Sequence, residues 1–486
     1  MGGVRGRFTI YVQGVGLLGL AGLGLVFATY AWLSAEPTDG FLAMALLSGA
    51  LGGALLGLGR SDADPGRRES LIGVLLLWLL LPLLGGVPFA VTLELSVLDA
   101  VFESMSGFTT TGATMLVSFA EVPASLFMWR ALTQWLGGVG IIVIFIAVFP
   151  PFGVAGRQLF FAEVPGPTEE RLTPRLRNTA AAVLLVYLLL TLLCGLSYAV
   201  AGMSRYDALL HALTTIASGG FSSHPLSFEG FSPAQNWVAV LFMVFAGANF
   251  ALQYQLVVGR PLALLRDREF QTYLAIVGVG GLLLTLTLWE LYTPIEALRH
   301  GMFQSLTMVT TTGYASADFV RWPLPAQATL VLLMFVGGSA GSAAGGIKVI
   351  RWLILVKATA VELRRTLHPR VVKPVMVGRR VVREEVIRAV AAFITLYLLL
   401  FAATTWTVTV LGEDFTTALT AAVACIGNIG PGLGAVGPMA NFAELHPVSK
   451  GLLTFGMYAG RLEVVTVFVL LNRDFWYLPR KKGARY

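Results

Sequence analysis

Charged residues are scarce in this sequence. Asp, Glu, Lys and Arg together make up 13% of its 486 residues, whereas soluble proteins carry about 25%. Hydrophobic residues account for 56% of the chain, and they gather in runs long enough to cross the roughly 30 Å hydrocarbon core of a bilayer. The shortage of charge therefore excludes a soluble multidomain protein and favours a polytopic membrane protein.

Cysteine and histidine are also rare, which argues against two further kinds of protein. Cys194 and Cys425 both lie in apolar segments, so no disulfide framework is expected. The five histidines show no paired metal-ligand spacing, and His211 is expected to be a packed residue rather than a ligand. A membrane enzyme or receptor would need a metal cluster or a Ser/His/Asp set, so the sequence predicts no enzyme.

The net charge of +7 indicates a membrane topology rather than a nucleic-acid partner. When loops are assigned alternately to the two sides of a membrane, most of the 34 Lys and Arg residues share the side of the N-terminus. The opposite side receives Arg130, Arg205, Arg299, Arg321 and Lys450. Because cytoplasmic loops carry the excess of basic residues, both termini are predicted to be cytoplasmic.

One motif returns four times along the chain. The stretch 102–114 reads as a short apolar helix followed by Thr-Thr-Thr-Gly, and 303–315 matches it at Phe, Ser, three Thr and Gly. Two more diverged copies end at Gly220 and Gly430. A helix of about ten residues is too short to span a bilayer, and each copy lies between two longer apolar segments. Such recurrence indicates four structural repeats.

The predicted fold is an all-α polytopic membrane protein, in which four pseudo-repeated helix–pore loop–helix units surround one central pore, plus an extra N-terminal helix pair. Ten crossings result, and each pore loop enters from the outer side. The second helices of repeats two and four are expected to be continuous, at 235–257 and 448–471. The expected divisions are the transmembrane helix pair (1–69) and pore repeats one (70–156), two (157–260), three with an intramembrane gate loop (261–365) and four with the cytoplasmic tail (366–486).

The end of each short helix has the chemistry of a cation site. Non-helical backbone within a membrane survives only where protein or a water-filled path satisfies it, so four such strips are expected to converge on one axis. Each short helix would direct its negative C-terminal end there, and carbonyl and hydroxyl oxygens can replace a cation's water shell. The predicted ion-binding residues of this selectivity filter are Thr110, Thr111, Gly112, Ser218, Gly219, Gly220, Thr311, Thr312, Gly313, Asn428, Ile429 and Gly430.

These motifs resemble those of a known family. The four-fold plan, with Gly-Phe-Thr-Thr-Thr-Gly-Ala-Thr, Gly-Gly-Phe-Ser, Thr-Thr-Thr-Gly-Tyr and Gly-Asn-Ile-Gly-Pro-Gly-Leu-Gly, resembles the Trk/Ktr/HKT superfamily of potassium transporters. The extra N-terminal helix pair is similar to that of the bacterial TrkH type. In this family one filter glycine per repeat marks potassium preference, and Gly112, Gly220, Gly313 and Gly430 fill all four places.

The resemblance implies a function and partners. It implies potassium uptake across the bacterial inner (plasma) membrane, with potassium as the transported ion and no organic cofactor in this chain. It also implies a homodimer and a cytoplasmic nucleotide-binding (ATP or NAD) regulatory subunit of the TrkA type. The basic stretch 357–388 would face that subunit, and contact with anionic membrane lipid is the alternative explanation. No nucleic acid is expected to bind.

A glycine run below the third strip is the expected gate. Residues 337–346 include five glycines, which favour a flexible loop over a regular helix, with a close-packing face as the alternative. A mid-membrane Arg such as Arg461 costs at least about 2.5–3.5 kcal/mol, so a functional role is expected. The resemblance implies that the loop obstructs the pore and that Arg461 repels cations. The predicted gate residues are Gly337, Gly338, Gly341, Gly345, Gly346, Lys348 and Arg461.

Three points stay open at this level. Glu463 lies two residues from Arg461, on another face of the helix, and is not its obvious partner. Glu463 and Asn249 are either functional or polar groups packed between helices. Transport is expected to be channel-like and driven by membrane potential, and the alternative is a proton- or sodium-coupled potassium symporter of the same fold.

Overall fold

The computed structural model describes residues 6–59, 67–147, 172–260, 262–370, 372–378 and 380–476, and the structural statements below concern these residues. The expected boundary between repeats one and two, at 156/157, lies outside them, as does the end of the cytoplasmic tail. The basic residues Arg5, Arg60, Arg157, Arg171 and those from Arg480 onward also lie outside them.

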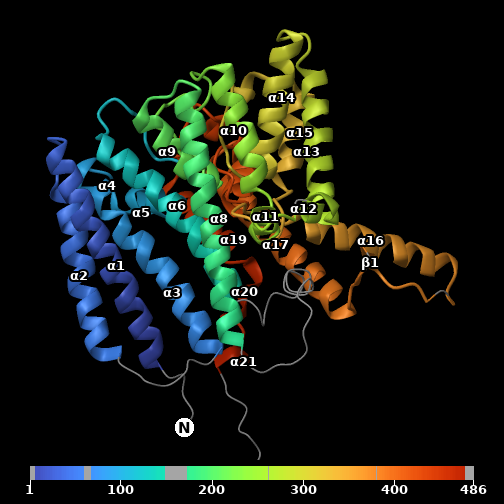
Figure 1. Cartoon of the computed structure of the whole chain (residues 1–486), viewed down its shortest axis with the longest axis horizontal. Helices are drawn as coiled ribbons and strands as arrows, with labels where there is room; N and C mark the ends of the chain where they lie inside the picture. The colour runs from blue at the N-terminus through green and yellow to red at the C-terminus, as the bar shows by residue number, and fades with distance from the viewer. Residues whose placement is uncertain are drawn as a thin grey trace, which may run out of the picture.

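The N-terminal helix pair stands at one edge of the bundle. It consists of α1 (Gly6–Leu33) and α2 (Asp39–Gly59), which pack along each other, and α1 also packs against the first helix of repeat one (Figure 1). The two helices approach closely at small residues, since a Cβ added to Gly14 would lie 2.9 Å from the carbonyl oxygen of Gly52. This is the small-residue packing that membrane helices use.

Each repeat contributes a long helix, a short helix and a second helix that is broken in three cases. Repeat one consists of α3 (Arg67–Gly85), α4 (Val87–Thr92), the short α5 (Val97–Phe108) and α6 (Ala124–Ala147). Repeat two consists of α8 (Leu172–Val200), the short α9 (Arg205–Ile216), α10 (Pro233–Ala246) and α11 (Phe250–Val257).

Repeats three and four follow the same order. After α12 (Leu262–Arg266), repeat three consists of α13 (Arg268–Thr287), the short α14 (Pro294–Val309), η1 (Phe319–Arg321), α15 (Leu324–Met334) and α16 (Val349–Leu367). A hairpin of β1 (Met376–Val377) and β2 (Arg380–Val381) leads to repeat four, with α17 (Glu384–Val410), the short α18 (Phe415–Ile426), η2 (Gly434–Val436), α19 (Pro447–Arg461), α20 (Val464–Val469) and α21 (Arg473–Trp476).

The repeats close into a ring. The second helix of each repeat packs against the short helix of the next, in the pairs α6 with α9, α10 with α14, α15 with α18, and α19 with α5. The last pair joins repeat four to repeat one, so the order is cyclic. The predicted all-α fold of four repeated units plus an N-terminal pair is therefore confirmed.

The short helices begin with side-chain caps. The hydroxyl of Ser96 accepts the N–H of Asp99 at the start of α5, and Ser204 and Asp207 repeat this contact at the start of α9. Asp414 accepts two backbone N–H groups at the start of α18. Such caps satisfy N–H groups that a helix start leaves unpaired. A helix of 12 residues such as α5 is only about 18 Å long, so it ends inside the protein.

Two expectations about the second helices are wrong. The segment 235–257 is not one helix, because α10 and α11 meet at an angle of 103°. Asn249 starts α11 afresh by accepting the N–H groups of Ala251 and Leu252. The segment 448–471 is also broken, since α19 ends at Arg461 and Glu463 has a φ of +67°. In repeat three, the predicted interruption by the glycine run is confirmed, because α15 ends at Met334 and α16 begins at Val349.

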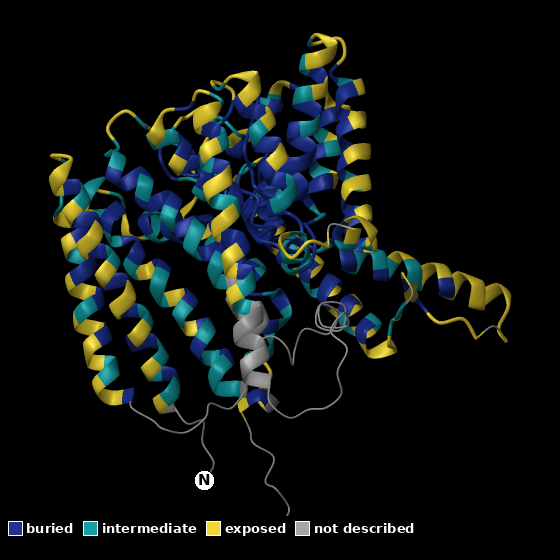
Figure 2. Cartoon of the chain, in the orientation of Figure 1, coloured by how far each residue is buried: buried dark blue, intermediate teal, exposed yellow. Residues whose placement is uncertain are grey.

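Exposed residues lie on the outer faces of the helices, and buried residues gather at the centre of the bundle (Figure 2). Six helical segments of the described residues are long and apolar enough to cross a membrane, and the bent pair α10–α11 makes a seventh. Three further segments complete the count. They are α6, with 24 residues, and the broken second helices of repeats three and four, each taken as one crossing. The total then agrees with the ten predicted crossings. Leu46, Leu192 and Leu282 are exposed on the outer faces, as expected for side chains that meet lipid.

An ion pair joins repeats four and one where the ring closes. The ammonium of Lys450 lies 2.7 Å from a carboxylate oxygen of Asp99, and the Lys450 side chain is 8% exposed. We expect Asp99→Asn to lower the stability of the purified protein by about 1–3 kcal/mol, because it leaves a largely buried charge poorly paired. The midpoint of thermal unfolding in detergent measures this. The double variant Asp99→Asn/Lys450→Met should recover most of the loss; a purely additive loss would contradict the interaction.

Candidate cation filter

The four predicted filter segments share one backbone conformation. We call them strip 1 (110–112), strip 2 (218–220), strip 3 (311–313) and strip 4 (428–430). The first residue of each has a left-handed φ between +53° and +55°, and the last is a glycine with a φ between +78° and +106°. Ser and especially the β-branched Thr rarely adopt this conformation, whereas Asn adopts it more readily. Its recurrence at the same place in four diverged sequences marks a functional constraint on the backbone.

The same hydrogen bonds end all four short helices. In strip 1, the N–H of Thr111 donates to Ser106 (2.8 Å) and the N–H of Thr110 donates to Gly107 (2.9 Å). Strips 2, 3 and 4 repeat both contacts at the corresponding residues. These are the two bonds of a Schellman motif, which pairs the last carbonyls of a helix with the residues after it. The strips are therefore continuous with the short helices that carry them.

The strips form a closed ring in which each glycine faces the next strip. A Cβ on Gly220 would collide with the carbonyl oxygen of Thr312, and one on Gly313 with that of Ile429. A Cβ on Gly430 would lie 2.7 Å from the carbonyl oxygen of Thr111. A Cβ on Gly112 would likewise meet the carbonyl oxygen of Gly219. The carbonyl oxygens of the four middle residues thus pack against the four glycines in the cyclic order of the repeats.

The ring opens to one cavity. All four glycines line a vestibule of about 100 Å³, together with the residues that follow the strips. The structure therefore brings all the predicted filter residues together at one place. Backbone carbonyls in such a ring are hard oxygen ligands, the kind that alkali cations prefer.

The first residue of each strip carries a buried side-chain oxygen. Thr110 Oγ1, Ser218 Oγ and Asn428 Oδ1 are buried, and the described residues supply them with no hydrogen-bond partner. The equivalent oxygen of strip 3, Thr311 Oγ1, accepts the N–H of Gly345 at 2.6 Å. Buried oxygens that lack donors are available to a cation.

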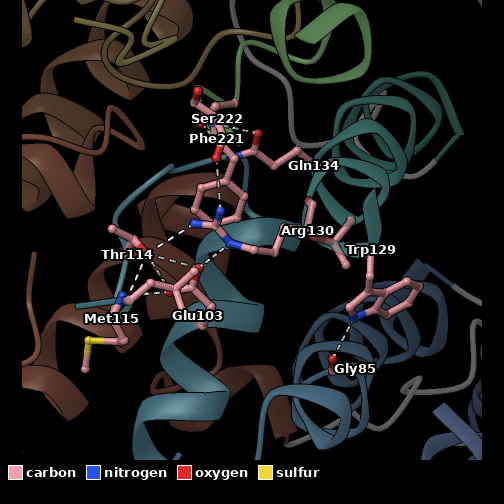
Figure 3. Close-up of polar contacts among 12 residues, drawn as sticks. Gly85, Glu103, Thr114, Met115, Trp129, Arg130, Gln134, Phe221 and Ser222 are labelled. Carbon is pink, nitrogen blue, oxygen red and sulfur yellow. Dashed lines mark hydrogen bonds and ion pairs between the residues drawn. The ribbon is translucent and has the colours of Figure 1, made fainter. Parts of the chain in front are cut away.

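A buried ion pair, not predicted from the sequence, supports the residues that follow strip 1. Glu103 of α5 is fully buried and accepts hydrogen bonds from Arg130 Nε (2.7 Å), from the N–H of Met115 (2.7 Å) and from the hydroxyl of Thr114 (3.2 Å) (Figure 3). Arg130, which the charge pattern assigns to the outer side, is only 2% exposed. A carboxylate on an apolar helix needs a partner. The presence of Glu103 on such a helix could therefore have indicated a buried ion pair.

The glycine run forms a buried loop that touches strips 3 and 4. We call residues 335–348 the Gly-rich loop. Its neck is closed by hydrogen bonds from Gly337 to Ile347 (2.8 Å) and from Val349 to Gly338 (3.2 Å). Gly345 donates to Thr311 Oγ1, and a Cβ there would lie 2.9 Å from the Cβ of Asn428. The loop therefore lies directly against the first residues of these two strips.

The bends of neighbouring elements supply the loop's partners. The N–H of Ser339 donates to Gly247 (2.9 Å) and the N–H of Phe250 donates to Gly341 (3.1 Å), at the break between α10 and α11. Glu269, at the start of α13, accepts the N–H of Ala340 at 2.6 Å. Helix breaks are where backbone groups become free to pair with such a loop. Glu269 was not predicted from the sequence.

The predicted gate charges lie at this loop. Arg461 is 4% exposed and donates to the carbonyls of Ala343 in the loop (2.8 Å) and Gly137 in α6 (3.2 Å). Among the described residues no carboxylate forms an ion pair with Arg461. Lys348 donates to the Ala344 carbonyl within the loop.

The remaining polar residues have structural contacts. Glu463 pairs with Arg351 of α16 at 2.5 Å, not with Arg461. His211 is buried, and its ring nitrogens lie 2.8 Å from the Asp207 carbonyl and 3.0 Å from the Ser222 hydroxyl. Its expected role as a packed residue is confirmed by these contacts.

Comparisons with known proteins agree with this architecture. A family model described as "TrkH: Cation transport protein" matches residues 60–475. The chain is 40% identical to a Trk system potassium uptake protein TrkH of Salmonella typhimurium, over 86% of this chain and 88% of that protein. A protein of the same name from Escherichia coli is 39% identical, over 84% and 86%. The crystal structure of the potassium transporter TrkH from Vibrio parahaemolyticus superposes with a TM-score of 0.89 and 34% identity, covering 97% of this chain and 99% of that one.

The packing of the strips can be tested without a transport assay. We expect Gly313→Ala to lower the stability of the purified protein by at least about 2 kcal/mol, because alanine resists a left-handed φ and its Cβ would collide with the Ile429 carbonyl. Gly278→Ala is the matched control, since a Cβ there meets open space on α13. Thermal unfolding in detergent compares the two. Equal stabilities would show that strip 3 does not pack against strip 4 in this way.

Proposed function

The chain belongs to the TrkH family of cation transport proteins, and from this membership we propose that it takes up potassium into the cell through the four strips. The observation that supports the proposal most directly is the closed ring of middle carbonyls, each packed against the glycine of the preceding strip. A potassium ion at the axis would exchange its water shell for these oxygens.

Membrane potential is the proposed driving force. Each positive charge that enters gains about 2.3 kcal/mol per 100 mV of potential, so a passive pathway suffices for uptake. The negative ends of the four short helices face the ring, which favours a cation there without any acidic side chain. The proposed transport is therefore channel-like, with potassium as the transported ion and no organic cofactor.

The Gly-rich loop and Arg461 form the proposed gate. The loop lies against Thr311 and Asn428, so it obstructs the path of an ion that leaves the ring on that side. Arg461 joins the loop to α6 and adds a buried positive charge with no acidic partner among the described residues. In surroundings of low polarity, that charge repels a cation more strongly than it would in water. Opening would require the loop to release Arg461.

The proposed setting is the bacterial inner membrane, with both termini in the cytoplasm. Helix α16 projects from the bundle (Figure 1), and Lys357 on it donates to the carbonyl of Met376 in the β1–β2 hairpin at 2.8 Å. This basic projection is where we place the contact with a nucleotide-binding regulatory subunit of the TrkA type. A homodimer is the proposed assembly.

The transport proposal is tested in liposomes that contain the purified protein. We expect potassium and rubidium to enter under an imposed membrane potential alone, with much less entry of sodium. The measurement is repeated with and without a proton gradient and a sodium gradient. Entry that requires either gradient would favour a symporter of the same fold. If no cation enters even with the Arg461→Ala variant, the proposed pathway is wrong.

The gate proposal predicts that Arg461→Ala raises potassium flux, because the variant removes both the charge and the tie to Ala343. Arg461→Lys keeps the charge and should stay closer to the parent protein. Potential-driven rubidium uptake at equal protein content provides the comparison, with Arg321→Ala, an exposed site, as the control. Unchanged flux in Arg461→Ala would rule out this role.

A further inference from the structure

We propose that Gln134, on α6 of repeat one, is the positioning residue for strip 2 of the neighbouring repeat and thereby sets the preference of the filter for potassium over sodium. This inference rests on the proposed function, since it concerns the selectivity of the same ring. It assigns a role to a residue outside the strips, one that no feature of the filter motif singles out.

The other strips carry their own side-chain supports. In strip 1, the hydroxyl of Thr111 lies 2.8 Å from that of Thr109. In strip 3, Thr312 and Thr310 repeat this contact at 2.8 Å. In strip 4, Asn428 Nδ2 donates to Thr111 Oγ1 at 3.0 Å and to the Met457 carbonyl at 2.9 Å. Each of these strips is therefore tied to its surroundings by side chains at the filter itself.

No side chain of strip 2 makes such a contact, and the hydroxyl of Ser218 has no hydrogen-bond partner among the described residues. The residues equivalent to the two paired threonines are Ala217 and Gly219, which have no hydroxyl group. Strip 2 also contains two consecutive glycines, and glycine has the greatest backbone freedom. The left-handed φ values of Ser218 and Gly220, +53° and +79°, therefore receive no side-chain support from strip 2 itself.

Gln134 supplies the missing support. Its Nε2 donates to the Gly219 carbonyl at 2.6 Å, and its Oε1 accepts the N–H of Phe221 at 3.1 Å. The side chain is fully buried, and a Cβ added to Gly219 would overlap its amide group. Gln134 thus occupies the space of the absent side chain and holds strip 2 at two points, on either side of Gly220.

The same face of α6 also contacts the residues that follow strip 2. Arg130 lies four residues before Gln134, so both point to one side of the helix, as Figure 3 shows. Its guanidinium lies 3.9 Å from the centre of the Phe221 ring and donates to the Ser222 carbonyl at 3.3 Å.

Backbone groups make the corresponding contacts in two other repeats. The Thr114 carbonyl accepts the N–H of Phe442 (2.9 Å), and the Ala315 carbonyl accepts the N–H of Phe228 (2.8 Å). These carbonyls follow strips 1 and 3 as Ser222 follows strip 2. Strip 2 is therefore positioned by side chains of repeat one, whereas strips 1 and 3 are positioned by their own threonines and by a backbone hydrogen bond.

The contact bears on selectivity because Gly219 contributes one of the four ring carbonyls. A carbonyl oxygen has two lone pairs, so the bond from Gln134 fixes its direction and leaves one lone pair for the ion. In the described part of the chain, Gly219 is the one middle carbonyl that accepts a side-chain hydrogen bond. Without that bond, the diglycine could move toward the axis and bring an oxygen closer to a smaller cation. Sodium would then be admitted more readily.

The test compares rubidium and sodium flux through variants in liposomes. Gln134→Met keeps most of the volume and removes both hydrogen bonds, whereas Gln134→Glu keeps an acceptor for Phe221 and removes the donor to Gly219. We expect both to lower the rubidium-to-sodium ratio roughly tenfold, the factor that about 1.4 kcal/mol represents for a lost hydrogen bond to a buried group. Rubidium flux itself should persist.

The matched control is Gln327→Met on α15. Gln327 also donates to two backbone carbonyls, those of Val320 (2.8 Å) and Trp322 (2.9 Å), but away from the strips. The Gln327→Met variant should leave the rubidium-to-sodium ratio unchanged. An unchanged ratio in both Gln134 variants, in protein that still conducts rubidium, would overturn the inference and leave the proposed function intact. Absence of cation flux in both the parent protein and the Arg461→Ala variant would instead reject the proposed function.

Discussion

The four strips depend on a steric constraint between the last glycine of each strip and the middle carbonyl of the next. A strip ends at a residue with a left-handed φ, and the place where its Cβ would stand is taken by the carbonyl oxygen of the following strip. Only glycine meets both conditions at once. Because this relation runs from strip 1 through strip 4 and back, the four glycines and the four middle carbonyls form one closed unit. The caps of the short helices, the ion pair between Lys450 and Asp99, and the packing of each second helix against the next short helix all serve to keep that unit closed.

The repeats have kept this backbone while exchanging the side chains that hold it. Repeats one and three use a pair of threonine hydroxyls, and repeat four uses Asn428. Repeat two uses Gln134 of its neighbour. A similar exchange occurs on the short helices, where the position of Glu103 in repeat one is taken by His211 in repeat two, and each contacts the loop that follows its strip. What is equivalent among the repeats is therefore the path of the chain and the position of its oxygens.

The surroundings of the Gly-rich loop show how irregular backbone can be tolerated in a membrane. The Gly-rich loop leaves many peptide groups outside any helix, and burial without partners would be costly. Breaks in α10–α11 and in α19–α20 lie beside this loop, and the freed carbonyls and N–H groups of the first break pair with it. Glu269 and Arg461 satisfy further groups of the loop. The interruptions in three different second helices are thus parts of one arrangement around the loop.

The membrane class, the four repeats and the glycine at the end of each strip could all be predicted from the sequence, because each has a local signature. Long apolar runs predict membrane-spanning helices, and a recurring motif predicts structural repeats. The breaks at Asn249 and Glu463 could not be predicted, since an apolar segment of sufficient length gives no sign that its backbone groups will pair with a distant loop. Nor could the pairing of Glu103 with Arg130, or that of Gln134 with Gly219, because these partners lie 27 and 85 residues apart in the chain. The packing of α6 on α5 within repeat one brings the first pair together, and the packing of α6 on α9 of repeat two brings the second pair together. Both contacts exist only in the folded protein.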